Sequence, residues 1–370
     1  MSEALGRHRA SGRPLFDLTV SNPTECGFAY DASILSALAN PAGLAYTPEA
    51  RGLDVARSAV SDYYAARGDA VSPGDIFLTT STSEAYSFVF RLLCNPGDEI
   101  LIPAPSYPLF DYLAELSDVK LLRYPLVYDH GWQVDFHELE RAISGRTRGV
   151  IVVHPNNPTG QFCKAGEVAR LNEICSGASL AIIADEVFLD FALNGERVGG
   201  FAGNLPALTF ALSGISKICG LPQMKMAWLS VSGPADLKRA AMERLEVIAD
   251  TFLSMNAPVQ LALASFLELR HELQRRLMER VRANLAVLDE RLATQTTCSR
   301  LECEGGWYAV LRVPATRSDE ELAIELISAR DVYLHPGHFF DFSGDGYLVV
   351  SLLAAKSVFS EAILRVISFF

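Results

Sequence analysis

The chain has 370 residues, a length that suggests two domains or one large one. Hydrophobic residues make up 49% of the chain and charged residues 21%, so it can build a sizeable core and is not a disordered chain. The net charge of −12 argues against nucleic-acid binding, because contacts to phosphates require a basic surface. The seven cysteines include no Cys-x-x-Cys pair, so they indicate neither a disulfide framework nor a zinc site.

The start of the chain and its most apolar segments bear on its location. Residues 1–18 are polar and basic and lack the apolar stretch of about 7–15 residues that a secretory signal needs. Residues 179–192 are interrupted by Asp185 and Glu186, and residues 348–355 are far fewer than the ~20 that cross a bilayer. We therefore expect a cytoplasmic protein with reduced thiols, no membrane segment and no nucleic-acid partner.

From about residue 75 to residue 232, short apolar runs alternate with amphipathic segments, a pattern typical of βα units on a mainly parallel sheet. Two helices, 31–39 and 51–67, are expected before this region. The expected strands are 76–80, 99–102, 120–124, 148–154, 180–185, 208–212 and 226–231, and the expected helices are 83–94, 108–116, 164–175 and 235–253.

The pattern changes after Pro258. Residues 259–293 carry apolar residues at helical spacing and predict one long connecting helix, and the tail then alternates strands and helices as in an α+β domain. Its expected elements are strands 307–313, 332–335 and 347–352, the helix 319–329 and a final helix. The expected division is a large domain at residues 41–257 and a smaller one made of an N-terminal arm, 1–40, and residues 258–370.

Polar motifs follow three consecutive expected strands. They are HPNNPTG at 154–160, DEVF at 185–188 and SGISK at 213–217. Because ligands of open α/β sheets bind beyond the carboxyl ends of the strands, these motifs are expected to meet at one site.

The ordered set of Asn-Asn-Pro-Thr-Gly, a later Asp and then Ser-Lys resembles the class I and II aminotransferases, which are fold-type I pyridoxal-phosphate enzymes. The resemblance runs from SNPT at 21–24 to the last strand. It implies an α/β fold with a mainly parallel central sheet flanked by helices, and a smaller α+β domain. It also implies pyridoxal 5′-phosphate, transfer of an amino group between a small-molecule donor and an oxo acceptor, and a homodimer with shared active sites.

The resemblance assigns a role to each matching residue. Lys217 would form the Schiff base with the cofactor and move the proton during transfer, whereas the plain alternative is a surface lysine. Asp185 would pair with the pyridine nitrogen, and a purely structural carboxylate there would need another cationic partner. Asn157 would donate to the ring 3′-oxygen, and Tyr107 would stack on the ring.

The cofactor phosphate is expected at a helix start, where free N–H groups favour an anion. Thr82 and Ser83 are the expected contacts, and the alternative is that one of them simply caps the helix. Ser216 is a further candidate, and Lys225 stands where the family commonly has an arginine. Tyr46 matches the tyrosine that reaches the phosphate of the neighbouring subunit. Ser213 is a weaker candidate, because the usual hydroxyl position is occupied by Gly214.

The sequence departs from the family at two positions. Phe188 replaces a tyrosine that donates to the cofactor 3′-oxygen, and Val349 replaces the arginine that binds the substrate α-carboxylate. Three explanations of Val349 stay open: a substrate without a free α-carboxylate, a different alignment of this strand, or a substitute cation. The candidate substitutes are Arg13, Arg51, Arg197 and His338.

Two other function classes remain to be weighed. A lyase, decarboxylase or racemase could use the same fold and cofactor, since the fold does not determine which bond breaks. A non-catalytic aminotransferase-like domain is the other alternative, but such a domain would have no chemical need for Lys217. Dinucleotide-binding, P-loop, nucleophile-elbow and metalloprotease motifs are absent from the sequence.

Overall fold

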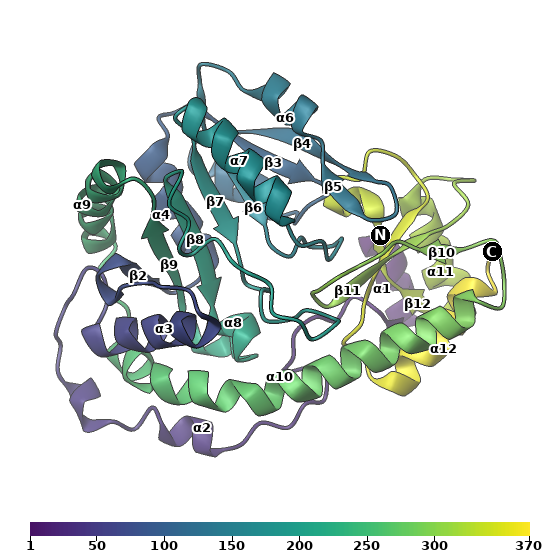
Figure 1. The fold of residues 1–370 in the computed structure, drawn as a ribbon. Coiled ribbons are helices and arrows are strands. Elements are labelled where there is room, and N and C mark those ends of the chain that lie inside the picture. Colours follow the sequence, from purple (N-terminus) through teal and green to yellow (C-terminus); the bar gives the residue numbers. More distant parts are fainter.

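The apolar runs in the middle of the chain form one eight-stranded sheet in the computed structural model, which describes residues 1–370 (Figure 1). Five neighbouring strands pair in parallel, whereas β2, β9 and β5 pair antiparallel. The expectation of a mainly parallel sheet is thus confirmed. Its order is β2 (Ile76–Thr79), β9 (Ala227–Ser232), β8 (Thr209–Gly214), β7 (Ala181–Asp185), β6 (Thr147–Val153), β3 (Glu99–Ala104), β4 (Lys120–Tyr128) and β5 (Trp132–Val134).

Helices cover both faces of this sheet, so the central strands β7, β8 and β9 are buried along their whole length. One face is covered by α4 (Thr82–Leu93), α5 (Phe110–Glu115) and α9 (Ala235–Thr251). The other is covered by α3 (Asp54–Arg67), α6 (Phe136–Ala142), α7 (Ala165–Gly177) and α10 (Ala257–Leu292). Neighbouring residues of a strand point to opposite faces. In β6, Val152 packs on the face covered by α3, α6, α7 and α10, and Val153 packs on the face covered by α4, α5 and α9.

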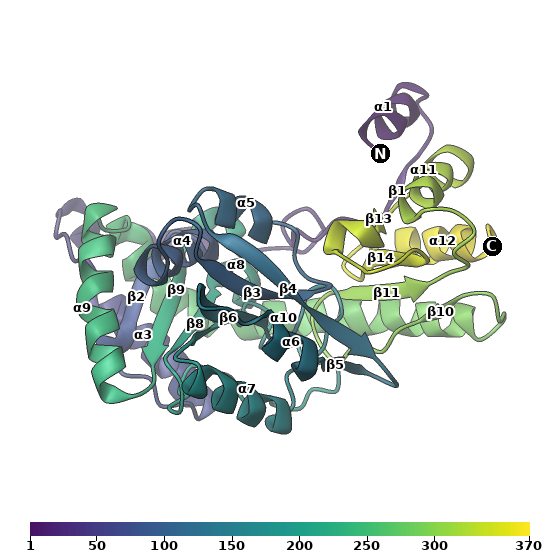
Figure 2. The same cartoon turned by 90° about the horizontal axis from the view of Figure 1, so that it is seen from above.

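The two ends of the chain come together in a smaller body (Figure 2). Its antiparallel sheet has the order β10 (Ser299–Arg300), β11 (Tyr308–Arg312), β14 (Tyr347–Ser351) and β13 (His335–Pro336). It also contains α11 (Asp319–Arg330) and α12 (Lys356–Ile367). β1 (Phe16–Asp17) pairs in parallel with β12 (Val332–Tyr333), and α1 (Ser2–Ala10) packs on α11. The N-terminal arm therefore belongs with the tail.

The long helix α10 contacts both bodies. Leu263 and Phe266 in its first half pack in the core under the large sheet, whereas Leu277 and Val281 in its second half pack in the core of the smaller body. Figure 1 shows this helix running beneath both parts. The expected boundary at residues 257 and 258 falls at its first residue, and a division into two domains there stays a prediction.

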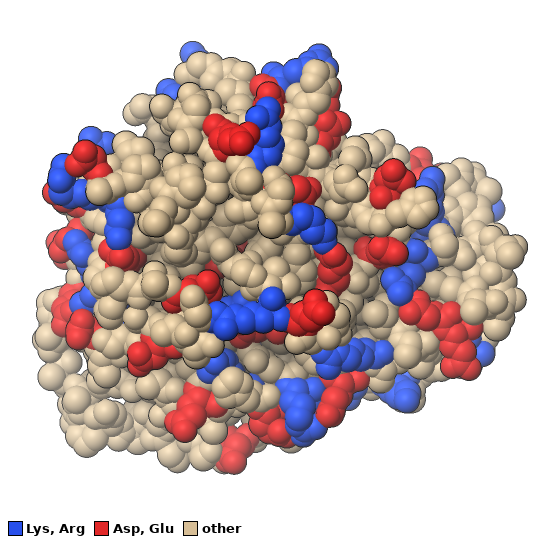
Figure 3. Space-filling view, in the orientation of Figure 1, with Lys and Arg blue, Asp and Glu red and all other residues tan.

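Several elements differ from the sequence prediction. The helix expected at 31–39 is only the four-residue α2 (Ser33–Ser36), and β5 and α6 were not expected. Short segments complete the chain: η1 (Pro41–Leu44), η2 (Pro73–Asp75), α8 (Ile215–Ile218), η3 (Pro222–Met224) and η4 (Gly337–Phe340). No helix is long and apolar enough to cross a membrane. Acidic and basic side chains are interspersed over the face shown in Figure 3.

The packing of α10 in the core under the large sheet leads to a prediction about stability. Replacing Phe266, which is 1% exposed, by Ala is expected to lower the free energy of unfolding by about 3–5 kcal/mol, through lost burial and the cavity left behind. Leu269→Ala in the same helix is the control, because Leu269 is 45% exposed and its loss should change stability little. Denaturant titration of both variants measures this, and equal losses would contradict it.

Candidate active site

The carboxyl ends of β6, β7 and β8 open into a cavity of about 170 Å³ that β11 and the N-terminal arm close from the other side. Seven of the ten residues expected from the sequence line this cavity: Thr82, Tyr107, Asn157, Asp185, Phe188, Ser216 and Lys217. Ser21, Ser81 and Tyr308 also line it, although the sequence reasoning did not assign them to the site. The strand ends therefore bring three distant motifs to one place.

Asp185 ends β7 and is 7% exposed. One carboxylate oxygen accepts a hydrogen bond from the Val187 N–H at 3.2 Å, and the other accepts one from the Tyr86 hydroxyl at 3.1 Å. Burial raises the pKa of Asp185 to about 6, although both hydrogen bonds and the Lys217 charge oppose the rise. The carboxylate thus lies in the cavity wall without a bound cation.

Lys217 lies in the one-turn helix α8 directly after β8. Its Nζ lies 5.1 Å from the centre of the Trp307 ring and 5.5 Å from that of Phe188, and it forms no ion pair. Loss of hydration in this aromatic setting lowers its pKa to about 8, against the opposing effect of Asp185. A substantial fraction of the amine is therefore neutral at slightly alkaline pH.

Asn157 stands in the tight turn after β6. The neighbouring Asn156 shapes this turn, since its side-chain oxygen accepts from the Thr159 hydroxyl at 3.0 Å. Gly160 closes the turn at φ 73°, where a Cβ would lie 2.6 Å from the Gly305 carbonyl oxygen. In contrast, Asn157 Oδ1 is buried without a hydrogen-bond partner. The turn therefore presents one unsatisfied amide to the cavity.

The opposite end of the cavity lies at the start of α4. Ser81, not Thr82 or Ser83, is the N-cap, because its hydroxyl accepts from the Glu84 N–H at 3.2 Å. The alternative that Thr82 or Ser83 caps the helix is therefore wrong, since the helix begins one residue earlier than expected. First-turn N–H groups have no partner within a helix, so this end can bind an anion, and the Thr82 and Ser216 side chains line the same end.

Gly214 lines the cavity where β8 approaches β9 most closely. A Cβ at this position would lie 2.8 Å from the Ala227 Cβ and 2.9 Å from the Met226 carbonyl oxygen. Ser213 does not line the cavity, and its hydroxyl donates to the Glu186 carbonyl oxygen at 3.4 Å. The strand spacing therefore keeps the cavity free of a side chain here.

Aromatic residues form the roof and one wall. Tyr107 is 39% exposed, and Phe188 packs edge-on against Trp307 at 5.0 Å between ring centres. Burial raises the pKa of Tyr308 to about 12, although the neighbouring Ser21 side chain opposes the rise. The N–H of Ser106, next to Tyr107, donates to the Phe340 carbonyl oxygen at 2.8 Å, so the loop carrying Tyr107 is tied to the smaller body.

Three expected residues lie outside the cavity. Ser83 does not line it, Lys225 is exposed at the end of η3, and Tyr46 is 78% exposed. The sequence reasoning also missed Tyr86, the partner of Asp185. Its place four residues after Thr82, on the same face of α4, is the signal that could have identified it.

Val349 lies in β14 and is fully buried. Its neighbours Leu348 and Val350 point into the core of the smaller body, whereas Val349 points to the core shared with the large sheet. Directly opposite it stand Val310 of β11 and His335 of β13, and burial lowers the pKa of His335. The direct cross-strand neighbours of Val349 are therefore an apolar side chain and a histidine whose charged form is disfavoured by burial.

Comparison with known proteins identifies the class to which this site belongs. Residues 25–357 match the family described as aminotransferase class I and II. Glutamate-pyruvate aminotransferase AlaA of Haemophilus influenzae is 26% identical, over 99% of this chain and 93% of that protein. Alanine aminotransferase of Mycobacterium tuberculosis is 24% identical, over 98% and 87%. The solved alanine aminotransferase of Pyrococcus furiosus shares the fold, with a TM-score of 0.90, 22% identity and coverage of 100% and 95%.

The chain therefore belongs to the class I and II aminotransferase family and has the fold-type I architecture that the sequence led us to expect. It is an aminotransferase, and its family depends on pyridoxal phosphate.

The buried carboxylate predicts a pH-dependent stability of the cofactor-free chain. Because the pKa of Asp185 rises from 3.8 to about 6 on folding, the folded state binds more protons between these values, and its stability falls as pH rises through them. Asp185→Asn should therefore stabilise the chain above pH 6, by up to about 3 kcal/mol, and have little effect below pH 4. Denaturant titrations at several pH values measure this, and a destabilised variant at pH 8 would contradict it.

Proposed function

We propose that the cavity binds pyridoxal 5′-phosphate and that the chain transfers an amino group between a donor and an oxo acceptor with Lys217 as its central base. The observation that carries this proposal is the meeting of an unpaired amine, a buried carboxylate and an unsatisfied amide, those of Lys217, Asp185 and Asn157, in one cavity. When bound, pyridoxal phosphate supplies an electron sink that stabilises charge on the substrate carbon.

The residues present fit this cofactor. A protonated ring nitrogen would give Asp185 the cationic partner that its buried carboxylate lacks, and would restore its pKa toward an ordinary value. The Asn157 Nδ2 would donate to the ring 3′-oxygen as its only side-chain donor, because Phe188 has no hydroxyl. Thr82, Ser216 and the start of α4 would hold the phosphate.

The chain's own groups then account for proton transfer. Lys217, with its pKa lowered to about 8, can accept a proton from the substrate carbon and return it. Tyr107 would cover the outer face of the ring, and Phe188 and Trp307 keep water from the amine. A low-dielectric wall of this kind strengthens the interaction between Lys217 and Asp185.

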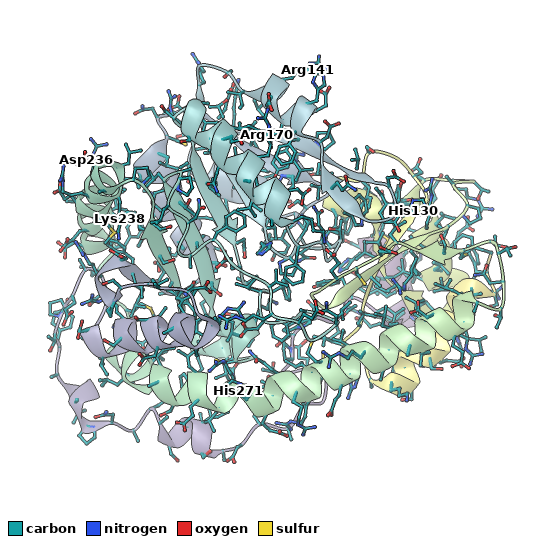
Figure 4. The ribbon with its side chains drawn as sticks, viewed as in Figure 1. His130, Arg141, Arg170, Asp236, Lys238 and His271 are labelled. Carbon is teal, nitrogen blue, oxygen red and sulfur yellow. The ribbon has the colours of Figure 1, made fainter.

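The surroundings of Val349 support an uncharged substituent on the reacting carbon of at least one substrate. Lys217 is the only cationic side chain that lines the cavity. Arg13 binds Asp331, Arg51 binds Glu246, Arg197 lies near the Ala66 carbonyl, and His338 is exposed. Arg170 on α7, Lys238 on α9 and His271 on α10, labelled in Figure 4, lie on outer helices. No arginine lines the cavity.

We also propose a cytoplasmic homodimer. Tyr46 and Leu44 are 78% and 93% exposed, an arrangement suited to burial against a second copy. In such a dimer Tyr46 would reach the partner's phosphate, which explains its distance from the cavity of its own chain. The seven cysteines are free, as a reducing compartment maintains them. Light scattering with Tyr46→Phe as a comparison tests the assembly: a monomer under assay conditions would refute it.

Removal of Lys217 tests the proposal directly. Purified wild-type chain is expected to show the visible absorption of lysine-bound cofactor, and Lys217→Ala to lack it while still binding the cofactor through Asp185 and the phosphate site. Absorbance of the dialysed proteins measures this. Lys225→Ala is the control, because Lys225 is exposed outside the cavity and its loss should leave the visible band in place. A wild-type chain that takes up no cofactor would overturn the proposal.

Matched substrates test the role of Val349. Alaninol and alaninamide should convert the cofactor to its amino form at least tenfold faster than alanine, because no cationic side chain other than Lys217 lines the cavity to bind the carboxylate of alanine. Val349→Arg should reverse this order, and Val349→Leu should preserve it. Release of carbon dioxide or cleavage of the amine, in place of the amino form, would favour a lyase or decarboxylase. Equal rates for alanine and alaninol in the wild type would refute the uncharged-substrate proposal.

A further inference from the structure

The helix that carries Lys217 is too short to hold its own position. α8 has four residues, begins at Gly214 without a side-chain cap, and closes with hydrogen bonds from the Cys219 N–H to the Ile215 carbonyl and from the Gly220 N–H to the Lys217 carbonyl, at 3.1 Å each. A single turn of helix is unstable alone. Groups outside the turn must therefore determine where Lys217 lies.

Gln274 of α10 supplies one such group. Its side-chain nitrogen donates to the Ile218 carbonyl oxygen at 2.9 Å, directly after Lys217, and to Asp190 Oδ2 at 2.8 Å. Both hydrogens of the amide are used, so the side chain has one geometry. The Tyr30 hydroxyl donates to the Gly220 carbonyl oxygen at 2.6 Å and holds the next turn.

Asp190 connects this contact to the other half of the site. It stands five residues after Asp185, in the same connection after β7, and its side chain is 8% exposed. Its second oxygen accepts from the Tyr63 hydroxyl at 3.0 Å and from Arg67, both on α3. The Arg67 guanidinium also donates to the Val198 carbonyl oxygen at 3.0 Å. The carboxylate is therefore fixed on one side by α3 and on the other by Gln274.

We infer that Asp190 and Gln274 are positioning residues that hold α8, and with it Lys217, at a fixed place relative to Asp185. The contacts run from α3 through Asp190 and Gln274 to the Ile218 carbonyl. The buried Asp190 carboxylate therefore connects the two sides of the cavity. Neither residue lines the cavity. The inference rests on the proposed role of Lys217.

The consequence for Lys217 follows from what surrounds it. Asp185 of β7 and Cys26 of the N-terminal arm are the titratable groups that act on its charge, and Tyr107 and Tyr308 line the same cavity. Burial is the largest influence on the pKa of Lys217 and lowers it. A loosened α8 would admit water to the amine, so the pKa of Lys217 should rise toward its ordinary range.

The test measures, at several pH values, the rate at which the cofactor-free full-length chain binds pyridoxal phosphate at Lys217. Attack requires the neutral amine, so the rate profile has an inflection at the pKa of Lys217. Gln274→Met, which keeps the length of the side chain and removes both donors, should move this inflection upward by about half a pH unit or more. Hydrogen exchange of residues 215–221 should become faster in the same variant.

Gln260→Met is the matched control. Gln260 also lies in α10 and is buried, and its amide donates to the Met255 carbonyl at 2.8 Å and accepts from the Leu53 N–H at 2.6 Å, far from α8. The Gln260→Met variant should be less stable than the wild type, but the inflection of its capture rate should stay at the same pH. If Gln274→Met fails to fold, Asp190→Asn, which preserves shape and removes the charge that Gln274 binds, takes its place with the same expected shift.

The outcomes distinguish failure of the proposed function from failure of the positioning role alone. A wild-type chain that shows no capture at Lys217, judged against Lys217→Ala, would refute the proposed function. Normal capture by the wild type with unchanged inflection and exchange in both Gln274→Met and Asp190→Asn would refute the positioning role alone. An equal shift in Gln260→Met would refute it as well, because the effect would then reflect general loosening of α10.

Discussion

The arrangement of the site depends on one carboxylate buried where a strand ends. Asp185 follows four fully apolar residues of β7, so the chain carries it into the interior together with them. A buried carboxylate is tolerated only with compensating partners, and here a phenol and one N–H compensate it in part. In the proposed complex, a cationic ring would meet the remaining demand for positive charge. Lys217, Phe188 and Tyr107 line the same cavity as this carboxylate.

Glu186, next to Asp185 in the sequence, lies on the other face of the sheet. Because successive strand residues alternate, Glu186 points to the α3 side, where it accepts from the Phe201 N–H near Arg67. Burial raises the pKa of Glu186 to about 7. Two adjacent acids thus have separate surroundings: Asp185 faces the cavity, and Glu186 connects the loop around residue 200 to the sheet. Together with Asp190, three acidic residues lie within six positions at and after the end of β7, and each contacts a different part of the structure.

Local patterns in the sequence account for much of this structure, and long-range geometry accounts for the rest. The apolar runs of β6, β7 and β8 are buried on both faces, so their positions, and the motifs at their ends, were predictable. β5 and α6 were missed because a three-residue edge strand and a two-turn helix leave little periodic signal. Tyr86, Asp190 and Gln274 depend on contacts between distant segments. Lys225 and Tyr46 lie outside the cavity of their own chain, and their expected contacts with the phosphate stay predictions.

The close approach of β8 and β9 at Gly214 also limits how this enzyme can change. A serine or threonine there would need space that the Ala227 side chain and the Met226 carbonyl already occupy. Two of the clashing atoms, the Ala227 Cα and the Met226 carbonyl oxygen, belong to the backbone, so position 214 can gain a side chain only if β8 and β9 move apart. We therefore expect relatives that carry a hydroxyl at the position of Gly214 to show a wider spacing between these two strands.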